Sequence, residues 1–227
     1  MRLTSLDLSG SRPYLPQEII TWLISNAPNL KNIALNESYL QLDVANAMIN
    51  STHLAKLEIN QARRNDDFEG IIRFLNHHIE MGDTSTLEEI TITTRKMTSD
   101  ATWLSLISKL QCLKNLNLRT YCIPADCLPA MEEIGQGCPA LEELTLGKYN
   151  CDIGDGIIGS FCQHSNIKCL KIGSRSLSSV SLMLLTSTFS SLEQLYVRCN
   201  LPESVMMMLK NKHVSKIVIN TLPTATY

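Results

Sequence analysis

Three pairs of adjacent glutamates are the first residues whose type could carry chemistry, because two carboxylates can act as general acid and general base. They are Glu88–Glu89, Glu132–Glu133 and Glu142–Glu143. Neighbouring residues of a strand point to opposite sides, so such pairs do not converge on one substrate. The sequence also has no G-x-S-x-G elbow and no G-x-x-x-x-G-K-[ST] phosphate loop. We therefore expect no enzymatic activity.

Histidines and cysteines are the next candidates, as ligands for a metal. His77 and His78 are adjacent in a segment with helical spacing, whereas a helical metal pair is four residues apart. We expect the isolated His53, His164 and His213 at the surface. The eight cysteines contain no C-x-x-C pair, so we expect neither a zinc site nor another cofactor. They are Cys112, Cys122, Cys127, Cys138, Cys151, Cys162, Cys169 and Cys199.

The chain offers no feature of a secreted or membrane protein. Its first residues alternate in polarity and carry charge, unlike a signal peptide, and no apolar run reaches the ~18 residues of a membrane span. All eight cysteines follow residue 111, so disulfides would brace only half of the chain. We expect reduced thiols in a cytoplasmic or nuclear protein that does not bind membranes.

Composition restricts the kind of partner that the chain can bind. The 227 residues hold 20 Lys and Arg against 22 Asp and Glu, for a net charge of −2. This balance excludes the overall basic field of a nucleic-acid-binding protein. Hydrophobic residues make up 44% and aromatic residues only 5%, which indicates a folded chain with an aliphatic core.

An internal repeat shows which elements position the remaining candidates. The six-residue motif L-x-x-L-x-L, with Ile or Val accepted for Leu, occurs nine times at intervals of 22 to 33 residues, about 26 on average. The motifs begin at Leu3, Leu30, Leu54, Leu87, Leu113, Leu141, Ile167, Leu192 and Val214. The fourth and sixth residues alternate with polar ones, as in a short strand. Nine occurrences over the whole chain predict stacked units that share one core.

Helical spacing between the motifs completes each unit. We expect helices over residues 16–25, 43–49, 68–81, 101–110, 129–136, 154–162, 178–186 and 202–209. A strand followed by a helix in each repeat predicts an α/β leucine-rich-repeat solenoid, or horseshoe, with one curved parallel sheet. We expect residues 1–227 to form a single such domain. Because the first strand begins at Leu3 without a capping segment, we also expect either that the chain is a fragment, or that another domain or a partner covers this end.

Residues around the motif point to a subfamily. The run from Gly137 to Leu146 reads G-C-P-A-L-E-E-L-T-L, Cys122 follows the motif ending at Leu118, and Cys199–Asn200 follow the motif ending at Val197. These residues resemble the cysteine-containing leucine-rich repeats of F-box proteins, which read C-P-x-L-x-x-L-x-L with a Cys or Asn after the strand. Three repeats carry the resemblance, and the others are degenerate.

The resemblance implies a function in a eukaryotic cell. It implies the substrate-recognition region of a Skp–cullin–F-box ubiquitin ligase, which would reach a Skp-type adaptor only through an N-terminal F-box that this chain lacks. Residues 15–24 begin like an F-box, with L-P-x-E-I, but the next strand begins near Leu30, so we expect an ordinary repeat helix there. The alternative is a free-standing regulator of the ribonuclease-inhibitor or Ran GTPase-activator kind.

The concave strand face is where we expect a partner protein to bind. It carries motif positions three, five and seven, whose charges sum to −2 in the first four repeats and +3 in the last five. Tyr beside Arg is enriched at interface hot spots, and Tyr196 lies two residues from Arg198. We therefore expect an acidic or phosphorylated segment of the partner to contact the last five repeats. The predicted contact residues are Arg119, Lys171, Tyr196, Arg198, Lys216, Asn115 and Asn117.

Overall fold

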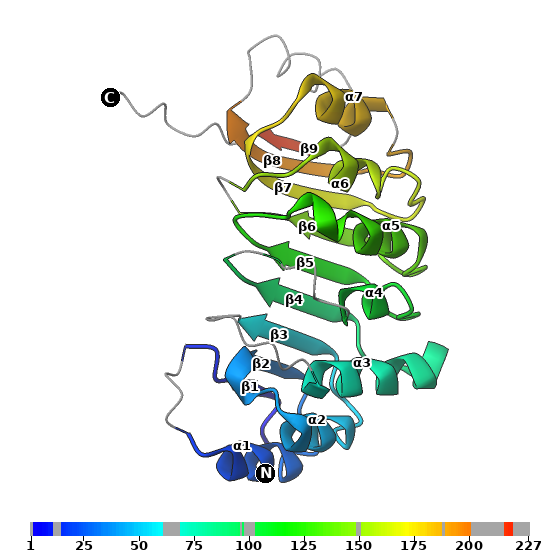
Figure 1. The fold of residues 1–227 in the computed structure, drawn as a ribbon. Coiled ribbons are helices and arrows are strands. Elements are labelled where there is room, and N and C mark those ends of the chain that lie inside the picture. Colours follow the sequence, from blue (N-terminus) through cyan, green and yellow to red (C-terminus); the bar gives the residue numbers. More distant parts are fainter. Residues whose placement is uncertain are drawn as a thin grey trace, which may run out of the picture.

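Nine parallel strands form one sheet in which the spatial order equals the order along the chain. The computed structural model describes residues 2–10, 15–60, 69–95, 97, 103–148, 151–187, 189–200 and 216–219. The strands are β1 (Ser5–Asp7), β2 (Asn32–Asn36), β3 (Lys56–Asn60), β4 (Glu89–Thr93), β5 (Asn115–Arg119), β6 (Glu143–Leu146), β7 (Cys169–Ser176), β8 (Gln194–Asn200) and β9 (Lys216–Ile219). Figure 1 shows them stacked from the N-terminal to the C-terminal end. Each strand is one of the nine motifs that the sequence predicts.

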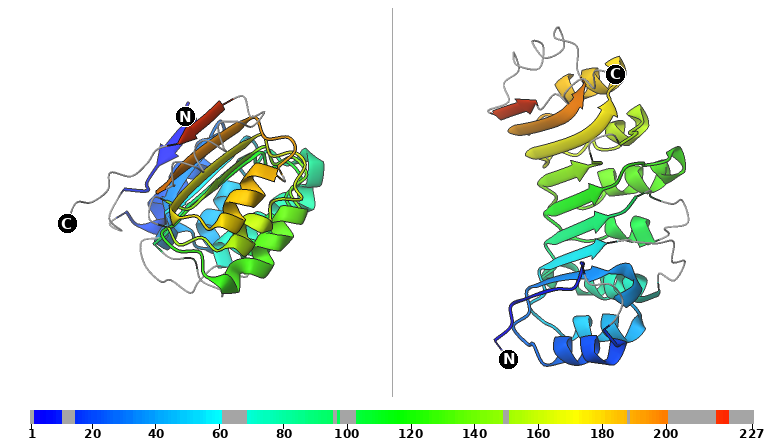
Figure 2. Two further views of the ribbon diagram at one scale, coloured as in Figure 1. Left: turned by 90° about the horizontal axis from the view of Figure 1, so that it is seen from above. Right: turned by 90° about the vertical axis from the view of Figure 1, so that its left-hand side faces the viewer.

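Helices cover one face of this sheet and leave the other face open (Figure 2). They are α1 (Gln17–Ser25), α2 (Leu42–Ile49), α3 (Glu69–Met81), α4 (Trp103–Ile107), α5 (Leu128–Gln136), α6 (Asp155–Gly159) and α7 (Ser179–Ser187). Short 3-10 turns occur at η1 (Glu37–Tyr39), η2 (Gly82–Thr84) and η3 (Ala125–Cys127). The chain is therefore an α/β leucine-rich-repeat solenoid with a single open parallel sheet.

Two predicted helices are longer than the observed ones. Helix α6 ends at Gly159 instead of residue 162, and α4 ends at Ile107 instead of residue 110. Gly156 and Gly159 lower the helix propensity of α6, and the residues after each helix turn back toward the next strand. The helix predicted over 202–209 lies outside the described residues.

The strand register keeps the repeats in phase. The fourth motif residues are direct neighbours across the sheet, as in Ile33, Leu57, Ile90 and Leu116. From β2 to β8 each of these side chains is at most 1% exposed, which places them in the core between sheet and helices. The prediction that positions four and six face inward is confirmed for these strands. Within the described residues, no helix is long and apolar enough to cross a membrane.

Cys138 shows what the cysteine of the C-P motif does. Its thiol is fully buried and donates a hydrogen bond to the Ile107 carbonyl oxygen at 3.0 Å, at the end of α4 in the preceding repeat. Burial raises the pKa of Cys138 to about 12, so the thiol stays protonated and able to donate. The residue has a φ of +49°, which only a few non-glycine residues adopt.

His164 occupies the position of Cys138 in the next repeat. Contrary to the surface position predicted from sequence, it is buried at 8% exposure, and its Nε2 lies 3.1 Å from the Cys138 carbonyl oxygen. The surface expectation holds for His53, which is exposed, whereas His213 lies outside the described residues. Because a histidine can hydrogen-bond backbone from the preceding repeat, a lone histidine at this repeat position belongs to the core.

Candidate functional site

Three rows of side chains cross the open face, one for each outward motif position. Over β5 to β8 the first row carries Asn115, Glu143, Cys169 and Gln194, and the middle row carries Asn117, Thr145, Lys171 and Tyr196. The third row carries Arg119, then Gly147 and Gly173, then Arg198. Gly147, directly after β6, and Gly173 of β7 thus leave two neighbouring positions of the third row without a side chain, and an arginine lies on either side of this gap.

A hollow of about 300 Å³ lies over this gap. Four of the seven residues that the sequence predicts for the site line it, although they come from three strands: Arg119, Lys171, Tyr196 and Arg198. Thr145, Gly147, Lys148, Ile172, Gly173, Val197 and Val218 also line it. Ile172 and Val197 are core residues at 2% and 1% exposure. We call this feature the cationic hollow, since it brings together two arginines and two lysines.

The backbone requires glycine at one of the two gap positions. Gly147 has a φ of +74°, in the left-handed region that favours glycine. A Cβ on Gly147 would lie 2.4 Å from the Gly173 carbonyl oxygen and 2.8 Å from the Cys151 Cβ. Strand β7 then shifts register between Gly173 and Ser176. The floor of the cationic hollow is therefore backbone, held in place by close packing.

Lys171 is held in position by two neighbours. Its ammonium forms an ion pair with Glu143 and lies 5.8 Å from the centre of the Tyr196 ring. Partial burial alone would lower the pKa of Lys171, but the hydrogen bond and charge of Glu143 outweigh it and raise the pKa above its usual value. The Tyr196 hydroxyl donates to Gln194 at 3.1 Å. Lys171 thus stays charged at neutral pH, and Glu143 offsets much of that charge.

Arg119 and Lys148 bring positive charge that no carboxylate among the described residues offsets. Arg119 is exposed at the end of β5, and among the described residues neither it nor Lys148 takes part in an ion pair. Lys148 lies 5.0 Å from the centre of the Tyr121 ring. The sequence prediction missed Lys148 because it lies one position beyond the alternating strand residues. Its place directly after Gly147 in a repeat with a third-row gap is the signal that could have found it.

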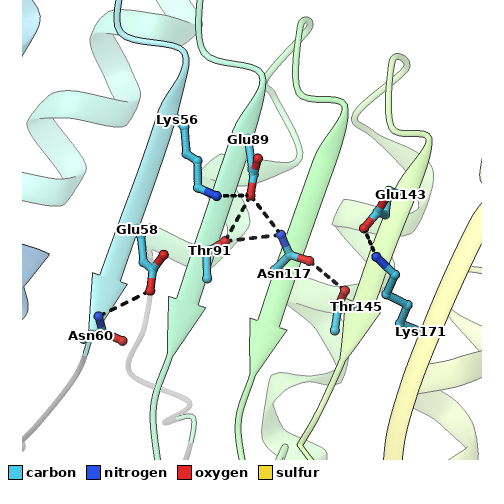
Figure 3. A network of polar contacts seen from close by, with 9 residues as sticks. All are labelled: Lys56, Glu58, Asn60, Glu89, Thr91, Asn117, Glu143, Thr145 and Lys171. Atoms are coloured by element: carbon cyan, nitrogen blue, oxygen red, sulfur yellow. Dashed lines mark hydrogen bonds and ion pairs between the residues drawn. The ribbon is translucent and has the colours of Figure 1, made fainter. Parts of the chain in front are cut away.

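The acidic half of the face lies at the other end of the sheet. Glu89 on β4 is neutralised by Lys56 at 2.8 Å, which leaves Asp7 on β1 and Glu58 on β3 as the acidic groups of this half. Figure 3 shows both the Lys56–Glu89 pair and the Glu143–Lys171 pair, with Asn117 on the strand between them. Because each ion pair cancels within its own half, the predicted opposition of a negative and a positive half persists in the folded chain.

Three predicted contact residues lie outside the cationic hollow. Asn117 is buried at 6% exposure, and its amide donates to Thr91 at 3.2 Å and to Glu89 at 3.4 Å, while its carbonyl accepts from Thr145 at 2.6 Å (Figure 3). Asn117 therefore ties β4, β5 and β6 together and presents little surface to a partner. Asn115 is half-buried in the first row, and the side chain of Lys216 is not among the described ones.

Replacing Asn117 with alanine should destabilise the fold. The change leaves the buried Thr91 hydroxyl and the half-buried Thr145 hydroxyl without these hydrogen bonds, which costs about 1–3 kcal/mol in the free energy of unfolding. Urea denaturation measures this loss. Asn115→Ala, on the same strand, should change stability by less than about 0.5 kcal/mol. Equal losses for the two variants would show that the amide network contributes nothing.

The carboxylate and histidine pairs take structural roles. Glu88 pairs with Lys114 at 2.6 Å and Glu142 with Lys168 at 3.0 Å, each away from its neighbouring glutamate. The glutamate pairs on strands therefore diverge, as predicted. His78 is buried, with its Nδ1 2.9 Å from the Ser85 hydroxyl. Within the described ranges, no three His, Cys, Asp or Glu side chains gather as metal ligands would.

Comparison with known proteins gives only distant similarities. No protein-family model matches the sequence, and no curated protein matches it. Among solved structures, the tropomodulin C-terminal domain of Caenorhabditis elegans is 12% identical, with 78% of this chain and 93% of that one covered and a TM-score of 0.42. A chain of the yeast Rad7–Elc1 complex is 14% identical, with 100% and 79% covered and a TM-score of 0.41. A chain of the TLR13–ssRNA13 complex is 17% identical, with 97% and 36% covered and a TM-score of 0.41.

Proposed function

We propose that this chain is a non-catalytic protein-recognition module whose cationic hollow binds an acidic segment of a partner protein. The observation that carries the proposal is the third row of β5 to β8, where Arg119 and Arg198 stand on either side of Gly147 and Gly173. Arginine and tyrosine are enriched at interface hot spots, and here Tyr196 and both arginines line one depression. An anionic side chain would enter the gap between the arginines.

The dimensions of the hollow favour a protein side chain over a free small molecule. Ligand pockets span about 300–1,000 Å³ and enclose most of the ligand, and the cationic hollow, at about 300 Å³, is at the lower end of this range. It also lies on an exposed strand face, where an extended partner segment can continue across neighbouring repeats. The net charge of −2 favours a local acidic group over a nucleic-acid backbone, which requires a broad basic surface.

The finer proposal concerns the assembly in which the module acts. The buried Cys138 of the C-P motif, with its hydrogen bond to the preceding repeat, supports the resemblance to F-box leucine-rich repeats. We propose that the chain selects substrates for a Skp–cullin–F-box ubiquitin ligase, with the F-box on a segment outside residues 1–227. A free-standing regulator remains the alternative.

Affinity capture of the tagged native gene product tests both the recognition proposal and the ligase proposal. Reversing both arginines, as Arg119→Glu with Arg198→Glu, should reduce the recovery of the bound partner about tenfold or more, because repulsion replaces attraction in the hollow. Quantitative mass spectrometry of the companions measures this loss. A Skp-type adaptor and a cullin should be recovered with both the wild type and the variant, because they bind elsewhere.

The matched control reverses two exposed charges on the helical side, Arg73→Glu with Lys109→Glu. It changes the net charge by the same amount and should leave recovery unchanged. If the reversal of Arg119 and Arg198 leaves every companion at its wild-type level while circular dichroism shows a folded chain, the recognition proposal is wrong. If the adaptor and cullin are absent from every sample, the ligase proposal is wrong and the free-standing regulator takes its place.

A further inference from the structure

We propose that the cationic hollow is specific for one phosphorylated side chain, a phosphoserine or phosphothreonine of the partner protein. This inference rests on the proposed function and names the chemical group that the hollow takes. The group recognised is a phosphomonoester dianion, carried on a side chain that is long enough to reach the surface of the sheet.

The absence of two side chains makes room for that group. Gly147 and Gly173 are neighbours in the third row, so over two strands the arginine-lined row has only backbone as its floor. Arg119 and Arg198 are three strand intervals apart, roughly 14 Å between backbones, yet both line the same hollow. Arginine side chains are long enough for the two guanidinium groups to contact one phosphate from opposite sides. Each guanidinium can present two parallel N–H groups to that phosphate.

The charge around the hollow suits a dianion better than a carboxylate. Four cationic side chains line it, Arg119, Lys148, Lys171 and Arg198. Glu143 offsets Lys171, and among the described residues no ion pair offsets Arg119 or Lys148. A phosphomonoester carries about −1.5 to −2 charges at pH 7 and three acceptor oxygens, against one charge and two oxygens for Asp or Glu. The phosphate therefore has enough charge and acceptor oxygens to pair with Arg119 and Lys148 together, whereas a carboxylate does not.

Glu143 also restricts where the anion lies. It is in the first row, on the opposite side of the middle-row Lys171 from the third-row gap. An anion bound near Glu143 would meet its carboxylate, whereas an anion over Gly147 and Gly173 is separated from it by the Lys171 ammonium. We therefore place the phosphate over the two glycines and expect no second anionic residue on the Glu143 side.

Peptide titration of the full chain tests the inference directly. The probes are three blocked pentapeptides, Gly-Ala-X-Ala-Gly, in which X is phosphoserine, glutamate or serine, and binding is followed by ¹⁵N NMR. The phosphoserine peptide should bind about tenfold or more tightly than the glutamate peptide, and the largest shifts should be at Gly147 and Gly173. Arg119→Gln should weaken that binding about tenfold, whereas the control Arg73→Gln on α3 should not.

A second variant separates shape from charge. Gly173→Val adds a side chain to the third-row gap without altering any charge, so it should abolish phosphoserine binding while the NMR spectrum stays dispersed. Equal affinity for the phosphoserine and glutamate peptides overturns the phosphate inference and leaves recognition of an acidic segment standing.

Phosphatase treatment of the cell extract before capture tests the same inference on the natural partner. Recovery of the partner that requires Arg119 and Arg198 should fall to the level of the doubly reversed variant. Unchanged recovery after complete dephosphorylation, with recovery still lost in the doubly reversed variant, overturns the phosphate inference alone. If recovery is unchanged after dephosphorylation and is also unchanged in the doubly reversed variant, the proposed function is wrong.

Discussion

Gly135→Ala should destabilise the chain by roughly 3 kcal/mol, although alanine normally stabilises a helix relative to glycine by about 1 kcal/mol. Gly135 lies in α5, and a Cβ there would be 1.9 Å from the Ser160 carbonyl oxygen and 2.7 Å from the Ser160 carbonyl carbon. Both contacts are to backbone, which cannot rotate away as a side chain can. Urea denaturation followed by circular dichroism measures the change.

The expected loss of stability follows from the way the repeats of a solenoid pack against one another. Each repeat contacts only its neighbours, so the closest approach of two helical turns sets the spacing of the strands behind them. A methyl group between α5 and the residue after α6 would force the repeats of β5 and β6 apart. Those repeats supply Arg119, Gly147 and Lys148 to the cationic hollow, so Gly135→Ala should weaken binding of the phosphoserine peptide as well.

Gly159→Ala is the matched control. Gly159 ends α6, and the nearest atom to its added Cβ would be the Leu184 Cδ1 at 3.8 Å, an ordinary van der Waals contact. This variant should be as stable as the wild type or slightly more stable. If Gly135→Ala is no less stable than Gly159→Ala, then α5 does not approach Ser160 as closely as the structure shows.

The strands could be predicted because their pattern is local and repeated. The motif residue four is apolar in all nine repeats, and a one-residue slip would turn all these side chains to solvent. In-register pairs such as Leu116 with Leu144 follow directly. Helix ends depend instead on contacts with the neighbouring repeats, such as that of Gly135 with Ser160, and no local pattern encodes them.

The candidate site could be predicted only in part. The alternation rule placed Arg119, Lys171, Tyr196 and Arg198 on the open face, and all four line one hollow. The rule predicts which face of the sheet a side chain lies on but not how deeply it is buried. It therefore could not distinguish the exposed Arg119 from the buried, hydrogen-bonded Asn117. Nor could it show that Glu143 pairs with Lys171 across neighbouring strands. Both properties depend on what the adjacent repeat places opposite.

Buried polar residues were also missed, because the sequence pattern does not show which polar side chains find a backbone partner in the core. The sequence aligns Cys122 with the cysteine that follows the strand, yet the fully buried hydroxyls near the ends of β5 and β7 belong to Thr120 and Ser174. Thr120 donates to the Cys122 carbonyl oxygen at 2.9 Å, and Ser174 donates to the Cys151 carbonyl oxygen at 3.0 Å. Threonine and serine hydroxyls thus form buried hydrogen bonds to the backbone here, and the motif does not specify them.

Acidification from pH 7.5 to pH 4.5 should cost the fold up to about 3 kcal/mol through His78 alone. His78 is 4% exposed on α3, with its ring against Phe74. Burial, and secondarily the charge of His77, lower the pKa of His78 from 6.5 to about 4. Between these values the unfolded chain takes up a proton that the folded chain does not. Stability is therefore full above pH 6.5 and falls as the pH approaches 4.

His78→Gln isolates this contribution, because glutamine can keep a hydrogen bond to Ser85 and does not titrate. Urea denaturation of the wild type and the variant at pH 7.5 and pH 4.5 gives two differences in unfolding free energy, and carboxylate effects common to both chains cancel. The wild type should lose up to about 3 kcal/mol more than the variant. His53→Gln, at an exposed position, should lose as much as the wild type. An equal loss for His78→Gln and the wild type would mean that the imidazole takes up its proton as readily in the folded chain as in the unfolded one.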